Sequence, residues 1–176
     1  MNRCSWCNLK NQKYVDYHDN EWCVLNMDER YLYEMFILES FQAGLSWECV
    51  LNKREAFLKA YDNFDIDKVV KYDDVKIEEL RNNKDIIRNR LKIQASINNS
   101  KIYMNIVNEF GSFYNYLSHF SGGRIFYEIG KTTSALSDKI SFDLRCRGMK
   151  FVGSTIIYSY LCAVGIIYAH ERTCFL

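Results

Sequence analysis

The 176 residues of this chain suit one compact domain, and a hydrophobic fraction of 48% excludes a disordered chain. The formal net charge of +1 gives no overall basic signal for nucleic acid. The N-terminus lacks the apolar core of a signal peptide, and the longest apolar stretch, residues 156–169, is too short to span a bilayer. We therefore expect a cytoplasmic protein with no membrane contact, whose seven cysteines are free thiols or metal ligands.

Helical periodicity extends through most of the chain, and no segment alternates convincingly like a strand. Asp28 is placed to cap a helix over residues 29–42, which Gly44 ends. The further predicted helices cover residues 48–62, 66–72, 76–82, 88–108, 112–117, 133 or 134 to about 147, and 155 toward 174. No repeat or linker interrupts this pattern. The prediction is a single all-α domain over residues 1–176.

Charge is distributed unevenly in the middle of the sequence. Acidic residues dominate residues 62–79, and basic residues dominate residues 81–101. Such asymmetry makes a basic face on an otherwise neutral protein, or it reflects two solvated helix faces. The sequence leaves both interpretations open.

A carboxylate falls on the apolar face of the helix predicted over residues 29–42. Leu32, Met35 and Phe36 share one stripe of that helix, and Glu39 continues it one turn later. A carboxylate in such a place loses solvation and needs donors or a cation. Glu39 is therefore a candidate for a functional site, with a structural ion pair as the alternative.

The segment after Glu39 strengthens the functional interpretation. Gly44 ends the helix in a turn that exposes Leu45, and an exposed leucine on a turn is suited to separating stacked bases. Trp47 follows closely, and an indole beside a buried carboxylate suits a flat cationic ligand. The remaining tryptophans are either further pocket walls or ordinary core residues: Trp6 and Trp22.

Cysteine and histidine residues occur near both ends of the chain. His170 and Cys174 are four residues apart, which on a helix would place them on one face, and Cys4 and His18 lie near the N-terminus. Two sulfurs and two imidazoles would complete the tetrahedral shell of a structural zinc ion. The spacing alone also fits ordinary buried thiols, and Cys7 competes with Cys4 as a ligand.

Several short segments, in this order along the chain, together resemble a known family. They are Arg3-Cys4-Ser5-Trp6, Tyr17-His18-Asp19-Asn20-Glu21-Trp22, Leu38-Glu39 with Gln42-Ala43-Gly44-Leu45-Ser46-Trp47, Ile86-Ile87-Arg88-Asn89-Arg90-Leu91-Lys92-Ile93, Lys150-Phe151-Val152-Gly153 and the terminal His170-x3-Cys174. In combination they resemble the 3-methyladenine DNA glycosylase I family of the helix-hairpin-helix superfamily. The resemblance covers nearly the whole chain and implies that family's fold.

The resemblance assigns roles to the candidate residues. It implies a structural Zn²⁺ that joins residues 1–25 to residues 165–176, with Cys4 rather than Cys7 among its ligands. The implied zinc ligands are Cys4, His18, His170 and Cys174. The implied base-binding and catalytic residues are Glu39 and Tyr17, with Trp47 for stacking and Trp6 and Trp22 as further walls.

The resemblance also implies a DNA-binding surface. Leu45 lies in the segment expected to fill the gap left by an extruded base, and residues 86–93 match a hairpin region that contacts the DNA backbone. The DNA-binding set is Gln42, Gly44, Leu45, Arg88, Arg90 and Lys92. Two residues depart from the family pattern, which usually has glycine where this chain has Asp85 and Cys23.

The implied activity is hydrolysis of the N-glycosidic bond of 3-methyladenine in double-stranded alkylated DNA by a monomer. The base is flipped into the pocket, the strand is not cut, and no residue is assigned to activate the attacking water. Two rival functions remain open on the sequence. One is a DNA-binding or damage-sensing module without activity. The other is a structural or interaction protein, stabilised by zinc, without a nucleic-acid role.

Overall fold

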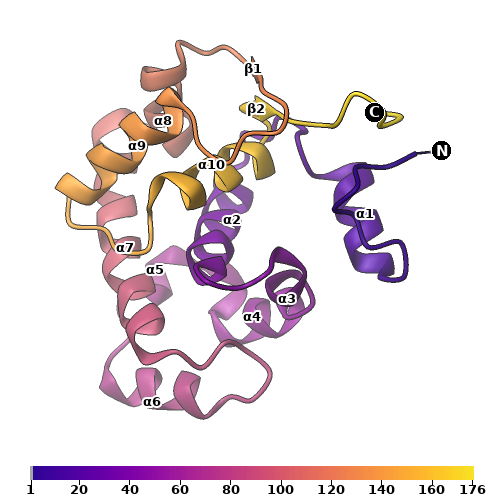
Figure 1. Ribbon diagram of the computed structural model, residues 1–176. Helices are drawn as coiled ribbons and strands as arrows, with labels where there is room; N and C mark the ends of the chain where they lie inside the picture. Colours follow the sequence, from indigo (N-terminus) through magenta and orange to yellow (C-terminus); the bar gives the residue numbers. More distant parts are fainter. Residues whose placement is uncertain (1) are drawn as a thin grey trace.

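The computed structural model describes residues 2–176, and its regular structure is mostly helical (Figure 1). The helices are α1 (Gln12–Asn20), α2 (Glu29–Gln42), α3 (Trp47–Leu51), α4 (Arg54–Ala60), the 3-10 turn η1 (Asp62–Phe64), α5 (Ile66–Val69), α6 (Asp74–Asn82), α7 (Arg90–Phe110), α8 (Phe113–Ser121), α9 (Ala135–Cys146) and α10 (Ser154–Ala163). Within residues 2–176, no helix is both long enough and apolar enough to cross a membrane.

A small parallel sheet corrects the expectation of a chain without strands. β1 (Phe126–Tyr127) pairs with β2 (Ile167–Tyr168), with Phe126 opposite Ile167. Each strand has only two residues, too few to produce an alternating pattern in the sequence. The sheet holds the C-terminal segment against the connection between α8 and α9.

The helix α2 lies at the centre of the molecule (Figure 1). The carboxylate of Asp28 accepts a hydrogen bond from the backbone N–H of Tyr31, which confirms the predicted cap. Side chains on nearly all sides of α2 are buried, because α3, α7, α8 and α10 pack around it. A helix that is apolar on most sides belongs in a core, and this one places Glu39 there.

The predicted helix over residues 48–62 is broken in the structure. α3 ends at Leu51 and α4 begins at Arg54, after which the backbone takes left-handed conformations at residues 62–64. Asn63 has φ 58°, a conformation that asparagine tolerates better than most residues. The helix α1, which the sequence did not predict, also belongs to the observed structure.

The last helix is much shorter than predicted. α10 ends at Ala163, and Gly165 follows with φ +77°. A Cβ at Gly165 would clash with the backbone of Val24 and Leu25, so the chain turns where only glycine fits. His170 and Cys174 therefore lie in an irregular segment rather than on one helix face.

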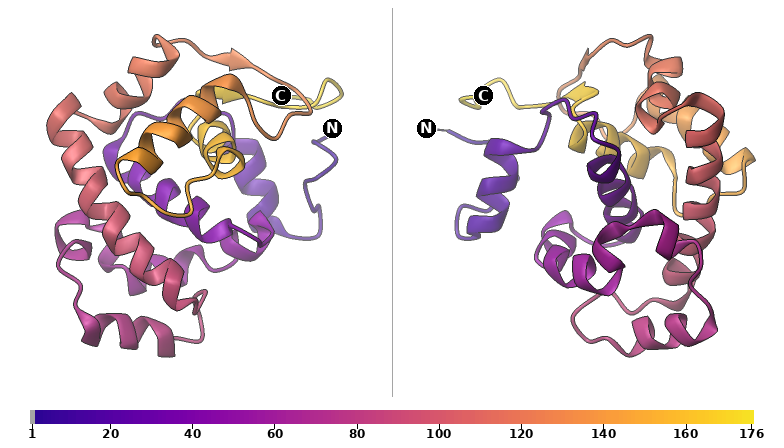
Figure 2. Two further views of the ribbon diagram at one scale, coloured as in Figure 1. Left: turned by 60° about the vertical axis from the view of Figure 1, so that its left-hand side comes forward. Right: turned by 180° about the vertical axis from the view of Figure 1, so that it is seen from behind.

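The two ends of the chain lie side by side, as both views of Figure 2 show. The backbone N–H of Phe175 donates to the carbonyl of Asn2 at 2.9 Å. The Ser5 hydroxyl donates to the Glu171 carboxylate at 2.6 Å. These contacts bring the N-terminal and C-terminal cysteine and histidine residues into one neighbourhood.

Candidate active site

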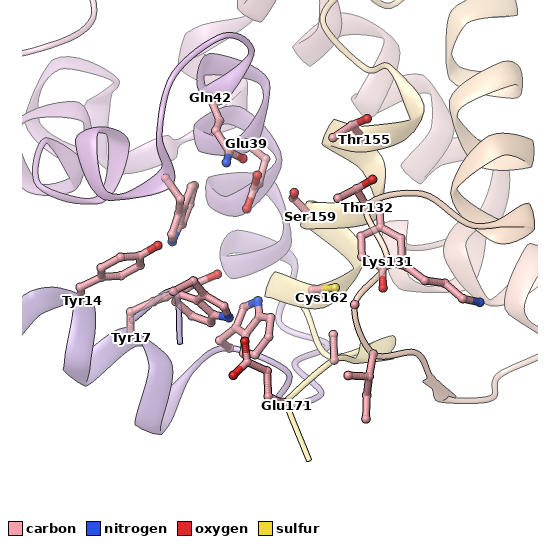
Figure 3. Close-up of a pocket in the computed structure, with 17 residues that line it drawn as sticks. Tyr14, Tyr17, Glu39, Gln42, Lys131, Thr132, Thr155, Ser159, Cys162 and Glu171 are labelled. Atoms are coloured by element: carbon pink, nitrogen blue, oxygen red, sulfur yellow. The ribbon is translucent and has the colours of Figure 1, made fainter. Parts of the chain in front are cut away.

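A cavity of about 310 Å³ opens between α1, α2, the start of α3, α10 and residues 129–132. Glu39 and Gln42 project into it from α2, Tyr14 and Tyr17 face it from α1, and Ser159 lines it from α10 (Figure 3). Pockets of this size hold small planar molecules. Its walls are Trp6, Tyr14, Tyr17, Trp22, Glu39, Gln42, Trp47, Ile129, Gly130, Lys131, Thr132, Thr155, Tyr158, Ser159, Cys162, Ala169 and Glu171.

The carboxylate of Glu39 is buried in this cavity, with 3% of the residue exposed. Its Oε2 atom has no hydrogen-bond partner within residues 2–176. Burial raises the pKa of Glu39 well above its usual range, because desolvation penalises the charged form. The ion pair that would have made Glu39 structural is not formed by the described residues.

Three further buried polar atoms of the cavity wall lack a partner within residues 2–176. They are Oε1 of Gln42, Nε1 of Trp47 and the hydroxyl of Tyr158. Buried polar groups are nearly always hydrogen-bonded, so several unpaired ones around one cavity indicate a place for a polar ligand or water. Together with Glu39 they offer both acceptors and donors.

Aromatic rings form one side of the cavity. The rings of Tyr17 and Trp47 lie 5.3 Å apart between centroids and are inclined by 49°. Trp6 and Trp22 meet edge to face at 4.6 Å, and both line the cavity as the sequence proposed. Tyr14, one helical turn before Tyr17, joins them and was missed because α1 was not predicted.

The wall contributed by α10 was also missed. Thr155, Tyr158, Ser159 and Cys162 line the cavity, and they occupy one face of the helix at i, i+3, i+4 and i+7. This polar stripe was visible in the sequence. The high apolar content of the segment led to its interpretation as a core helix only.

The turn after α2 has the geometry of a type II β-turn. The N–H of Leu45 donates to the carbonyl of Gln42 at 2.6 Å, Ala43 has φ −46° and ψ 114°, and Gly44 has φ +76°. Leu45 is 41% exposed at its tip. The turn therefore presents an apolar side chain beside the cavity that Gln42 and Trp47 line.

The predicted basic residues divide into two kinds. Arg88 and Arg90 are exposed, close to the start of α7. Lys92 is only 7% exposed, and its ammonium donates to the backbone carbonyls of Phe41 and Ala43. The assignment of Lys92 to the DNA-binding residues stays a prediction; in this structure its charge faces the end of α2 rather than solvent.

The four predicted metal ligands meet at one point, with all ligand atoms within 4.8 Å of one another. Sγ of Cys4 lies 3.5 Å from Nδ1 of His170, and Sγ of Cys174 lies 3.6 Å from Nε2 of His18. A tetrahedral zinc ion with bonds of about 2.3 Å to sulfur and about 2.0 Å to nitrogen spaces such atoms by roughly 3.5 Å. The cluster fits a metal ion of that geometry, and Cys7 lies outside it.

The outer hydrogen bonds of this cluster also suit a metal site. Nδ1 of His18 pairs with the carboxylate of Asp19 at 2.8 Å, and Arg3 holds that carboxylate from its other side. Nε2 of His170 faces the carbonyl of Trp22 at 3.3 Å. Such partners fix the ring orientation of ligating histidines. Because Trp22 also lines the cavity, the cluster supports the cavity wall directly.

The two departures from the family pattern have different structural consequences. Cys23 has φ 64°, so it occupies a left-handed conformation that glycine adopts without strain. Its Sγ accepts a hydrogen bond from the N–H of Ala169 at 3.3 Å. Asp85 does not have a positive φ, and its carbonyl accepts a hydrogen bond from the Lys53 ammonium at 3.0 Å.

Comparison with known proteins agrees with this geometry. A family model described as methyladenine glycosylase matches residues 6–176. The chain is 40% identical over 181 residues to DNA-3-methyladenine glycosylase 1 of Escherichia coli, with 99% of this chain and 96% of that protein covered.

Solved structures that resemble this chain carry the same family name. A crystal structure of 3-methyladenine DNA glycosylase I superposes with a TM-score of 0.94 at 37% identity, covering 99% of this chain and 98% of that one. A Staphylococcus aureus structure described as the basis of 3-methyladenine recognition by 3-methyladenine DNA glycosylase I has a TM-score of 0.93 at 31% identity, covering 99% and 96%.

Proposed function

Because this chain belongs to the methyladenine glycosylase family, we propose that it is a base-excision repair enzyme that releases 3-methyladenine from alkylated DNA. Relatives with this name match the chain over almost its full length. The observation that carries the proposal is the buried Glu39 carboxylate inside an aromatic cavity, whose Oε2 atom has no hydrogen-bond partner within residues 2–176. We propose that the enzyme acts on double-stranded DNA, as a monomer, in the cytoplasm.

The Glu39 carboxylate is suited to a base that carries positive charge. Methylation at N3 makes adenine in DNA cationic. Burial takes the Glu39 carboxylate out of water and so disfavours its negative charge. A cationic base in the cavity would stabilise that charge by electrostatic attraction. The exocyclic amine of the base can donate to the unpaired Oε2 atom. Trp47 would stack on the ring, and Tyr17 would orient it.

The base must leave the duplex to reach this cavity. Flipping costs a few kcal/mol, and the cost is smaller for a damaged base whose pairing is weakened. Leu45 is placed on an exposed turn beside the cavity and would fill the gap in the stack. Arg88 and Arg90 would contact the phosphates nearby.

In the proposed reaction the bond between C1′ and N9 breaks, and its electron pair neutralises the cationic base. Water then attacks C1′ of the oxocarbenium-like sugar and loses a proton, which leaves an abasic site. A cationic leaving group needs no strong acid. Strand cleavage would require an amine nucleophile. The cavity-lining Lys131 is instead paired with Glu128 at 3.2 Å, and an ammonium is not a nucleophile.

We further propose that the Cys/His cluster holds a structural Zn²⁺. Cys4, His18, His170 and Cys174 would fill all four positions and leave none for a substrate. The ion would supply no step of the reaction. Its contribution would be to join the chain ends and to support the wall at Trp22.

The direct test is to identify the bases released from methylated duplex DNA by chromatography. The proposal expects 3-methyladenine as a free base, without strand breaks. A damage-sensing module would bind the duplex and release nothing, and binding would weaken steeply with salt. A purely structural zinc protein would neither bind the duplex nor release a base. Either result would overturn the proposed function.

A further inference from the structure

The ammonium of Lys92 is buried without a counter-charge. It is 7% exposed, and it forms no ion pair with any carboxylate of residues 2–176. It donates to the carbonyl of Phe41 at 2.8 Å and to that of Ala43, and it lies 5.9 Å from the ring centre of Phe151. Burying an ammonium costs free energy, so these contacts must offset that cost.

The end of α2 supplies that compensation. The last carbonyls of a helix have no partners within it, and together they carry a partial negative charge. In α2 the Gln42 carbonyl is taken by the turn, and the carbonyls of Phe41 and Ala43 are taken by Lys92. The Lys92 ammonium, which comes from α7, therefore caps the C-terminal end of α2.

The same contact fixes the position of the exposed turn. A Cβ built on Gly44 would meet nothing within 4 Å, so the tip of the turn is not packed against the protein. Among residues 2–176, the hydrogen bond that Leu45 makes is the one from its N–H to the carbonyl of Gln42, within the turn. Lys92 supplies the side-chain hydrogen bond that ties Ala43 to another element within the described residues.

We infer that Lys92 is a positioning residue for base flipping. It holds the turn that carries Leu45 in the position from which the leucine side chain can enter the base stack. The inference rests on the proposed function, because it assigns Leu45 the role of the wedge. This role differs from that of a phosphate contact. A lysine that binds phosphate would have its ammonium exposed to solvent, as the side chains of Arg88 and Arg90 are.

The experiment compares Lys92→Met with Lys101→Met, an exposed lysine further along α7. Release of 3-methyladenine is measured from methylated duplex DNA and from methylated single-stranded DNA, and binding of free 3-methyladenine is measured separately. For Lys92→Met we expect kcat/KM on duplex to fall at least about tenfold, since small misplacements are costly. Single-strand release and free-base binding should change less than about threefold. Lys101→Met should match the wild type.

A second measurement separates positioning from phosphate contact. Loss of a phosphate contact lowers the slope of log binding constant against log salt by about 1. Lys92→Met should leave that slope unchanged, whereas Arg90→Met should lower it. In the Lys92→Met, Leu45→Ala double variant the loss on duplex should be no greater than in Leu45→Ala alone, because the two residues would act as a unit.

Equal losses on duplex and single strands, a lowered salt slope, or additive effects with Leu45→Ala would each overturn the inference. Where Lys92→Met lowers the folded fraction, Lys92→Arg keeps a cationic donor and should restore the ratio of duplex to single-strand activity. Failure of that rescue, with the variant folded, counts against positioning. If the wild type itself releases no base, the proposed function fails instead.

Discussion

Tyr17 and Trp47 form an open aromatic corner, with ring centroids 5.3 Å apart and planes inclined by 49°. The two residues come from α1 and from the start of α3, the helices that precede and follow α2 along the chain. Both rings line the cavity that Glu39 enters. This corner gives the Glu39 carboxylate a ligand-shaped space rather than an ordinary core environment.

Replacing Trp47 by alanine should weaken binding of free 3-methyladenine. Stacking of a base on an aromatic side chain contributes about 1–3 kcal/mol, so the dissociation constant should rise by roughly 5-fold to 150-fold. Isothermal titration calorimetry measures it directly. Trp47→Phe, which keeps a ring, should lose less. An unchanged dissociation constant in Trp47→Ala would refute the stacking role.

Glu39→Gln should sharply reduce release of 3-methyladenine from duplex DNA. The amide keeps the shape of the side chain but cannot take the negative charge that a bound cationic base would favour on Glu39, and hydrogen bonds to charged groups contribute about 1.5–3 kcal/mol. We expect kcat/KM to fall by roughly 10-fold to 150-fold, measured by release of the free base. Wild-type rates in a folded variant would remove Glu39 from the mechanism.

The same substitution should stabilise the fold at neutral and higher pH. Between 4.5 and the raised pKa of Glu39, the folded protein keeps a proton that the unfolded chain releases, so the contribution of Glu39 to the unfolding free energy falls as pH rises through that window. Glutamine has no such loss. Denaturant unfolding at pH 5 and pH 8 should show Glu39→Gln gaining about 1–3 kcal/mol on the wild type at the higher pH. A difference independent of pH would contradict the raised pKa.

Leu45→Ala should impair processing of duplex DNA more than binding of the free base. The side chain is 41% exposed on its turn and lies outside the cavity wall, so its loss leaves the base contacts intact. Removing the wedge should lower kcat/KM on duplex by at least about tenfold, since unstacking a base step costs a few kcal/mol. Free-base affinity, measured in parallel, should stay within about twofold. Equal loss of both would exclude the wedge role.

Removing the proposed zinc ion should loosen the joined chain ends. We expect one zinc ion per chain by elemental analysis of the wild type, and none in Cys174→Ala. The midpoint of thermal unfolding should fall by about 5–10 °C in that variant and after chelation. Cys146→Ala, at an exposed cysteine outside the cluster, is the matched control and should keep the ion. A full metal content in Cys174→Ala would disprove the ligand set.

Local patterns in the sequence were enough to predict the bounds of α2, its cap and its buried residues. The Asp28 cap, the buried stripe and the end at Gly44 all depend on residues within a few positions of one another, and the structure confirms them. Helical periodicity also identified Glu39 as a carboxylate on a buried face. The order of short segments along the chain identified the family and a cysteine and histidine set that the structure brings together.

Tertiary structure alone decided what surrounds those residues. Periodicity says which face of a helix is buried and not which element covers it, so the walls from α1 and α10 depended on the folded arrangement. The environment of Lys92 also depended on the fold. Whether a lysine in a basic segment faces solvent or binds helix carbonyls depends on residues that are far away in the sequence, here Phe41 and Ala43. Gly165 ended α10 because residues 24–25 pass against it, and this long-range contact put His170 and Cys174 on an irregular segment. Local propensity is set by neighbours in the chain, whereas the desolvation and pairing of a charge are set by neighbours in space.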